Sequence, residues 1–62
     1  MMTQYQKGTL VMNYLRGLGM ESVAILDAIC DENLEQSYKL IQENPKISKA
    51  EFLRRMPMVS ED

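Results

Sequence analysis

The side chains of this chain that could carry out chemistry are few, and their types exclude most catalytic sites. The 62-residue sequence has no histidine and a single cysteine. Without histidine, no Ser-His or Cys-His nucleophile can form, and one thiol cannot complete a nitrogen and sulfur zinc site. Asp31, Glu32 and Glu35 gather three carboxylates, but acids are ordinary in a first helical turn because they face the positive end of the helix dipole. We therefore expect a non-enzymatic protein with no catalytic residues, metal, cofactor or small-molecule substrate.

Basic residues are the second possible source of chemistry. Residues 21–44 have a net charge of −5, whereas residues 45–56 have a net charge of +3. Cations on a helix surface can contact phosphates, which makes a nucleic-acid-binding transcriptional regulator the alternative function. Four cations on one helix are more often a solvated surface, so this function is not the favoured one. The alternative nucleic-acid patch comprises Lys46, Lys49, Arg54 and Arg55.

Apolar residues at helical spacing indicate an all-α fold that would position these side chains. Leu10, Tyr14 and Leu18 follow one stripe at steps of four, and similar stripes recur along the chain, whereas alternating strand patterns do not occur. We predict a compact bundle of three to four short helices with tight turns, at about residues 9–18, 21–30, 32–44 and 49–56.

Capping residues mark the ends of the first and last predicted helices. Gly19 suits the left-handed backbone that often ends a helix, and either Thr3 or Thr9 could cap the start of the first helix. Ser48 and Glu51 have the spacing of a capping box at the start of the last helix. These capping signals predict where the helices end and short turns between them.

The third predicted helix has its own start and stop signals. Asp31 is a good N-cap, and Glu35 and Lys39 have the i,i+4 spacing of a favourable ion pair. Pro45 ends the helix because the residue before a proline is pushed out of helical geometry.

Residues 23–30 are apolar on nearly every side, with one acid, Asp27. Because the other three helices each bring one apolar face, we expect this helix to lie mostly in the core. Cys30 should then be a buried, unreactive thiol. The cover over Ile25 and Ala24 could come from the chain's own last helix or from a second copy of the chain, and the sequence leaves both open.

The length of the chain allows one domain. We predict a single helical domain over residues 1–56 and a flexible tail over residues 57–62, because Pro57 ends the last helix. No apolar run reaches the ~20 residues of a membrane-spanning helix. The first residues lack the basic-then-apolar order of a signal peptide. We therefore expect a cytoplasmic protein with no membrane partner.

Methionine is abundant, with six residues, and its flexible thioether side chain suits adaptable binding surfaces. Several apolar residues lie off the main helical stripes, and short helices cannot easily cover all of them. We expect an interface with another protein or with a second copy of the chain. The favoured function is a regulator, adaptor or inhibitor that acts by protein binding, of the type found in phage or plasmid accessory proteins. The candidate interface residues are Met12, Tyr14, Met20, Ile25 and Met56.

One stretch of the chain resembles a known domain family. Leu18-Gly19-Met20, the apolar helix after it and the segment Asn33–Ile41 before Asn44-Pro45 resemble a ubiquitin-associated three-helix domain. Here the loop order is Gly-Met, the loop aromatic is missing and a fourth helix follows. The resemblance covers about residues 10–45, and we assign no family from it.

Overall fold

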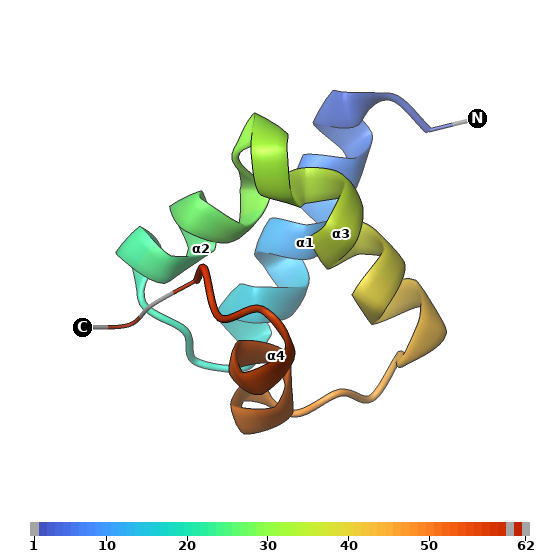
Figure 1. The fold of residues 1–62 in the computed structure, drawn as a ribbon. Coiled ribbons are helices and arrows are strands. Elements are labelled where there is room, and N and C mark those ends of the chain that lie inside the picture. The colour runs from blue at the N-terminus through green and yellow to red at the C-terminus, as the bar shows by residue number, and fades with distance from the viewer. Residues whose placement is uncertain (1, 60, 62) are drawn as a thin grey trace.

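Four helices form within residues 2–59 and 61, the part of the chain that this computed structural model describes (Figure 1). The predicted all-α fold is confirmed, and the described residues contain no strand. The predicted bounds differ from the observed ones by at most one residue, except at the start of the first helix. The helices are α1 (Gln4–Gly17), α2 (Ser22–Ile29), α3 (Asp31–Glu43) and α4 (Lys49–Arg55).

The first helix begins five residues earlier than the predicted start at residue 9. Thr3 Oγ1 accepts a hydrogen bond from the Gln6 N–H at 3.1 Å, and Gln6 Oε1 accepts one from the Thr3 N–H at 2.9 Å. This reciprocal capping box satisfies two backbone donors at the helix start. Thr9 lies inside α1, where its hydroxyl donates to the Tyr5 carbonyl. The prediction from Thr9 is therefore wrong, and the one from Thr3 is correct.

A glycine turn joins α1 to α2, as the sequence predicts. Gly19 has a φ of +82°, its N–H donates to the Arg16 carbonyl, and the Met20 N–H donates to the Leu15 carbonyl. These two bonds form the Schellman arrangement, which satisfies carbonyl groups at the end of α1. Met20 is buried next to this turn, so the turn fixes where α2 begins beside α1.

The junction between α2 and α3 differs from the prediction. Cys30 is the N-cap of α3 and makes no capping hydrogen bond through its side chain, while Asp31 is already the first helical residue. The prediction of Asp31 as N-cap is therefore wrong by one position. The buried Ser37 hydroxyl donates to the Ala28 carbonyl at 2.9 Å. Because that carbonyl lies in the last turn of α2, Ser37 satisfies a group that the helix itself leaves unpaired.

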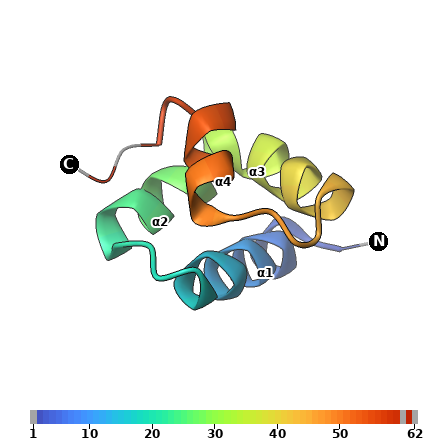
Figure 2. The same cartoon turned by 90° about the horizontal axis from the view of Figure 1, so that it is seen from below.

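The core lies between α1 on one side and α4 on the other, with α2 and α3 beside them (Figure 2). α1 packs against both α2 and α3, which also contact each other. Ala24 and Ala28 are four residues apart and fully buried, so their small side chains bring α2 close to its neighbours. The other fully buried apolar residues are Val11, Leu15, Phe52 and Met56.

The segment after Pro57, expected to be a flexible tail, lies against the helices where the structure describes it. Val59 is 3% exposed and belongs to the core. Glu61 accepts a hydrogen bond from the Glu21 N–H at 3.0 Å and pairs with Lys49 at 3.1 Å. The packed unit therefore extends past residue 56. Residues 60 and 62 of the predicted tail lie outside the described residues.

Candidate functional site

One face of α2 is apolar and exposed to solvent. Val23 is 61% exposed and Leu26 is 64% exposed, and their i,i+3 spacing places them on the same side of the helix. The expectation that this helix lies mostly in the core is wrong for this side. The buried side carries Ala24 and Ile25, and both are covered within this single chain, so no second copy is needed to bury them.

A shallow groove of about 250 Å³ lies beside this exposed face, between α1 and α2. Met20 and Ile25 are each 6% exposed, so they form its floor, whereas Arg16 and Leu26 are exposed at its edge. The groove brings together three predicted interface residues, Met12, Met20 and Ile25. We call the groove together with Val23 the α1–α2 face. The groove is lined by Met12, Arg16, Met20, Ser22, Ile25 and Leu26.

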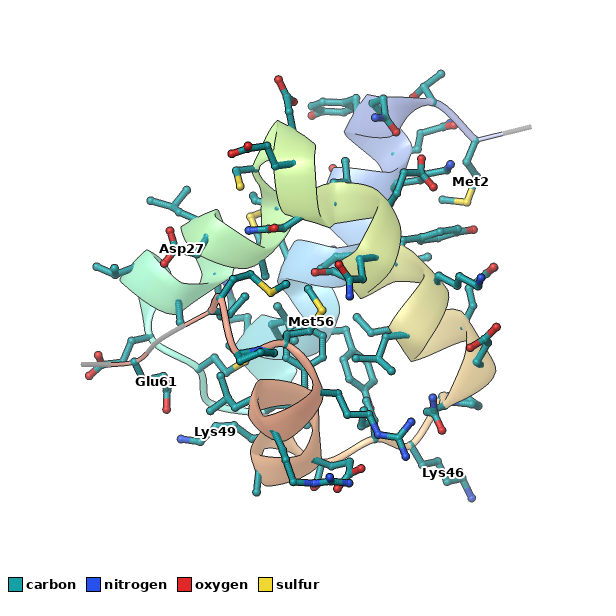
Figure 3. All side chains as sticks on the ribbon, viewed as in Figure 1. Met2, Asp27, Lys46, Lys49, Met56 and Glu61 are labelled. Atoms are coloured by element: carbon teal, nitrogen blue, oxygen red, sulfur yellow. The ribbon has the colours of Figure 1, made fainter. Side chains whose placement is uncertain are left out.

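The other two predicted interface residues lie elsewhere. Met56 is fully buried, because it follows Phe52 by four residues and both side chains point into the core. Met56 is therefore a core residue and not an interface residue (Figure 3). Tyr14 is half-buried, and its hydroxyl donates to the Ile47 carbonyl at 2.7 Å. This bond connects α1 to the loop before α4, away from the groove.

Cys30 is exposed, so the prediction of a buried thiol is wrong. The residue lies between two helices, where the chain turns, and its Sγ donates to the Asp27 carbonyl at 3.1 Å. Asn33 donates to the same carbonyl at 2.8 Å through its Nδ2. These bonds hold the start of α3 against the last turn of α2.

Exposed acids flank the α1–α2 face along the chain, although none of them lines the groove. Asn33 ties the start of α3 to the Asp27 carbonyl, and the acids of the first turn of α3 follow Asp27 by four and five residues. None of these acids forms an ion pair with any residue in 2–59 or 61. Arg16 is the single cation that lines the groove. We call this set the acidic rim, and it comprises Glu21, Asp27, Asp31 and Glu32.

The acids elsewhere are mostly paired, and one pair differs from the prediction. Glu35 pairs with Lys7 on α1 at 2.7 Å, and no Glu35–Lys39 pair forms in the described part of the chain. Lys7 also lies 5.2 Å from the centre of the Tyr38 ring. The contact with α1 therefore replaces the predicted pair within α3.

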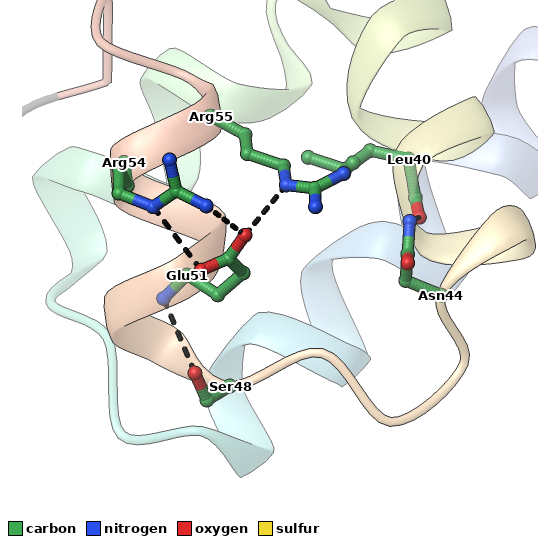
Figure 4. A network of polar contacts seen from close by, with 6 residues as sticks. All are labelled: Leu40, Asn44, Ser48, Glu51, Arg54 and Arg55. Atoms are coloured by element: carbon green, nitrogen blue, oxygen red, sulfur yellow. Dashed lines mark hydrogen bonds and ion pairs between the residues drawn. The ribbon is translucent and has the colours of Figure 1, made fainter.

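Three residues of the predicted nucleic-acid patch lie on α4 and Lys46 lies on the loop before it, and most of these cations are paired. Arg54 and Arg55 both bond to Glu51 (Figure 4), and these hydrogen bonds lower the pKa of the Glu51 carboxyl. Lys49 pairs with Glu61. Lys46 lies on the loop before α4, where it borders an open hollow of about 580 Å³ that also has two acids, Glu43 and Glu51.

The predicted capping box at the start of α4 forms only in part. Ser48 Oγ accepts a hydrogen bond from the Glu51 N–H at 3.1 Å. The Glu51 side chain turns toward the two arginines instead of returning to the Ser48 backbone. The arginines therefore compete with the cap for the same carboxylate.

Sequence reasoning missed Val23, Leu26 and Arg16, although two signals were present. Asp27 follows Val23 by four residues and directly follows Leu26, so its charge marks that side of the helix as the one facing water. Ala24 and Ala28 form a small-residue stripe on the opposite side, which suits close helix packing. Asp27 and the alanines together indicate which side of α2 is buried.

Two further structural tests concern metals and membranes. Within the described residues, no three histidine, cysteine or acidic side chains are placed to hold a metal ion together. Over the same part of the chain, every helix is too short or too polar to cross a lipid bilayer. Comparisons with models of known protein families, with curated proteins and with solved structures found no match to this chain.

Proposed function

We propose that this chain is a non-enzymatic interaction module that binds another protein through the α1–α2 face. The observation that supports the proposal is the exposure of Val23 and Leu26, at 61% and 64%, beside a groove with a methionine on its floor. Single exposed apolar residues are normal on protein surfaces. Two of them on one helical turn, next to a groove, form a connected apolar surface of the type that marks interaction sites.

The chemistry of this surface suits protein binding more than small-molecule binding. Fully burying an aliphatic side chain contributes about 1.5–3 kcal/mol, so Val23 and Leu26 could act as the central anchors of an interface. The groove holds about 250 Å³, below the ~300 Å³ at which most ligand pockets begin. Met12 and Met20 can change rotamer at little cost, which lets the surface adapt to its partner.

The finer parts of this function stay predictions. A role as regulator, adaptor or inhibitor is a hypothesis from the small size of the chain and its lack of histidine. A phage or plasmid accessory protein is a hypothesis on the same grounds. Location in the cytoplasm is a prediction of the same kind. The nucleic-acid alternative is less supported, because Glu51 and Glu61 pair with three of its four cations and offset half of the patch's positive charge.

A photo-crosslinking amino acid placed at position 26 tests the proposal. Leu26 is exposed, so the replacement does not disturb the core. The matched control places the same crosslinker at Ala50, which is exposed on α4. In a lysate of the source organism we expect a discrete protein adduct from position 26 and not from position 50, and we expect the adduct to weaken when Val23→Ala is added.

Three outcomes of the crosslinking experiment, and one of a DNA-binding experiment, would contradict the proposal. Equal adducts from both positions would show unspecific capture, and an absence of adducts would leave the face without a partner. An adduct of twice the chain mass in purified protein would show that a second copy occupies the face. Binding of a DNA duplex at ~50 mM salt, weakened by Arg54→Gln with Arg55→Gln, would favour the nucleic-acid alternative instead.

A further inference from the structure

We infer that the partner segment of the α1–α2 face is a cationic amphipathic helix, an inference that rests on the proposed function. The shape of the site is the first argument. The groove runs between two helices and joins an apolar ridge, Val23 and Leu26, on α2. Helices bind such grooves through apolar anchors at spacings of three and four residues.

Charge is the second argument, because four of the five described acids without an ion pair flank this face, and Glu43 is the fifth. The fold pairs three other acids with cations: Glu35 with Lys7, Glu51 with two arginines, and Glu61 with Lys49. The four acids of the acidic rim have no such partner among the described residues. Lysine or arginine on the flanks of a bound helix would supply the missing positive charge, since complementary potentials favour encounter and fix orientation.

A second copy of this chain fits the same face less well. A two-fold interface places the same surface patch of both subunits together, so two acidic rims would approach each other and repel. A second copy would bring one cation of the groove, Arg16, against four acids. Four of the chain's other cations lie on α4 or just before it, and one of these, Lys46, lies across the molecule from Asp27 (Figure 3). Arg54 and Arg55 are already bonded to Glu51. A separate basic segment therefore matches the face better than this chain does.

Two model peptides test the inference on the full chain. The first peptide contains only leucine and lysine in an amphipathic helical pattern, and the second has glutamate in place of every lysine. Fluorescence anisotropy measures the binding of each labelled peptide at low and at high salt. We expect the lysine peptide to bind at least about tenfold more tightly than the glutamate peptide, and its affinity to fall as salt rises.

Matched variants locate the binding. Val23→Ala with Leu26→Ala should weaken binding of the lysine peptide at least about tenfold, because both anchors are lost. Asp27→Asn should weaken it less, by about threefold, and should reduce the salt dependence. The controls are Leu10→Ala, a half-exposed apolar residue on α1, and Glu43→Gln at the far end of α3. Both controls should bind like the unmodified chain.

The other outcomes separate failure of the cationic-helix inference from failure of the proposed function. If both peptides bind equally and both lose affinity in the Val23 and Leu26 double variant, the face docks protein segments but does not select cations. If the lysine peptide binds regardless of that double variant, it is held by charge alone and the inference is wrong. If neither peptide binds and ultracentrifugation finds a dimer that the double variant breaks, a second copy occupies the face, and the proposed function fails as well. If neither peptide binds and the chain is monomeric, the inference fails, and the crosslinking experiment decides the proposed function separately.

Discussion

α2 and α4 are the two shortest of the four described helices, and they differ in how far their charges are paired and their apolar residues buried. α4 is rich in charge, yet its charges pair with one another and with Glu61, and its large apolar residue, Phe52, is fully buried. α2 has one charged residue, Asp27, which is unpaired within the described chain, and it leaves Val23 and Leu26 exposed. α2 is the more apolar helix in sequence, yet it exposes more apolar side chain and more unpaired charge than α4 does.

The difference teaches that the number of charges on a helix is a poor guide to its binding surface. An exposed ion pair contributes little to stability, about 0–1 kcal/mol, but it does reduce the net potential that a helix presents to a partner. Glu51 does this for two arginines at once. An exposed apolar pair beside unpaired acids can contribute more to binding. The apolar side chains are not buried within the chain, and the acids have no ion pair in its described part.

The largest expected effect compares a core position on α4 with an exposed position on α2. Phe52→Ala should cost about 3–5 kcal/mol, because the side chain is fully buried and its removal leaves a cavity. In a domain of 62 residues such a loss removes most of the stability. Leu26→Ala should change the free energy of unfolding by less than about 0.5 kcal/mol. Urea denaturation followed by circular dichroism measures both.

These two variants also test whether α2 exposes an apolar side chain in solution while α4 buries its own. If Leu26→Ala costs more than about 2 kcal/mol, where the range for buried leucines begins, its side chain is covered in solution. Repeating the measurement at several protein concentrations would then show whether a second copy provides the cover, because the stability of a dimer depends on concentration.

A smaller effect tests the turn that positions α2 beside α1. Gly19→Ala should destabilise the chain by about 1–2 kcal/mol, because a side chain disfavours the left-handed backbone found there. No atom lies within 4 Å of a Cβ built at this position, so the cost is purely conformational. Gly17→Ala is the matched control, since Gly17 is helical and equally uncrowded. It should stabilise the chain by about 0.5–1 kcal/mol in the same urea titration.

The two alanine variants should change the free energy of unfolding in opposite directions. If the two alanine variants change stability in the same direction, the turn does not have the left-handed conformation in solution. The placement of α2, and with it the α1–α2 face, would then need revision.

The smallest effect concerns pH and the ion pair between α4 and the chain end. The hydrogen bond from the Glu21 N–H, followed by the contact with Lys49, lowers the pKa of Glu61. Because the folded pKa is below the unfolded one, the contact stabilises the fold above the unfolded pKa and is lost as pH falls through the folded pKa. Glu61→Gln should therefore lower the melting temperature at neutral pH and make no difference in strong acid.

Asp27→Asn serves as the control for this titration, because Asp27 forms no ion pair within residues 2–59 and 61. Its effect on melting temperature should not follow the pH profile of the Glu61 variant. A Glu61→Gln effect that is the same at neutral and acid pH would show that the contact does not depend on charge.

Local signals predicted most of the fold. Gly19 and Ser48 have their predicted turn and cap roles, and helix spacing predicted all four elements. The candidate site was predicted in part, because Met12, Met20 and Ile25 line one groove. Met56 could not be separated from these residues by sequence, since whether an apolar side chain is covered depends on a neighbour far along the chain.

The sequence by itself determined the helical class, the turn at Gly19 and the lack of histidine chemistry, because these depend on residue type and on neighbours within four positions. Asp27 and the two alanines of α2 indicate which of its sides faces water, but only the tertiary structure showed that α1 and α3 pack against that helix and leave Val23 and Leu26 exposed. It also decided that Glu51 and Glu61 pair with the cations of α4. Val59 is buried in the core and holds Glu61 near both Lys49 and the start of α2. There Glu61 accepts a hydrogen bond from the Glu21 N–H, 40 positions away in sequence.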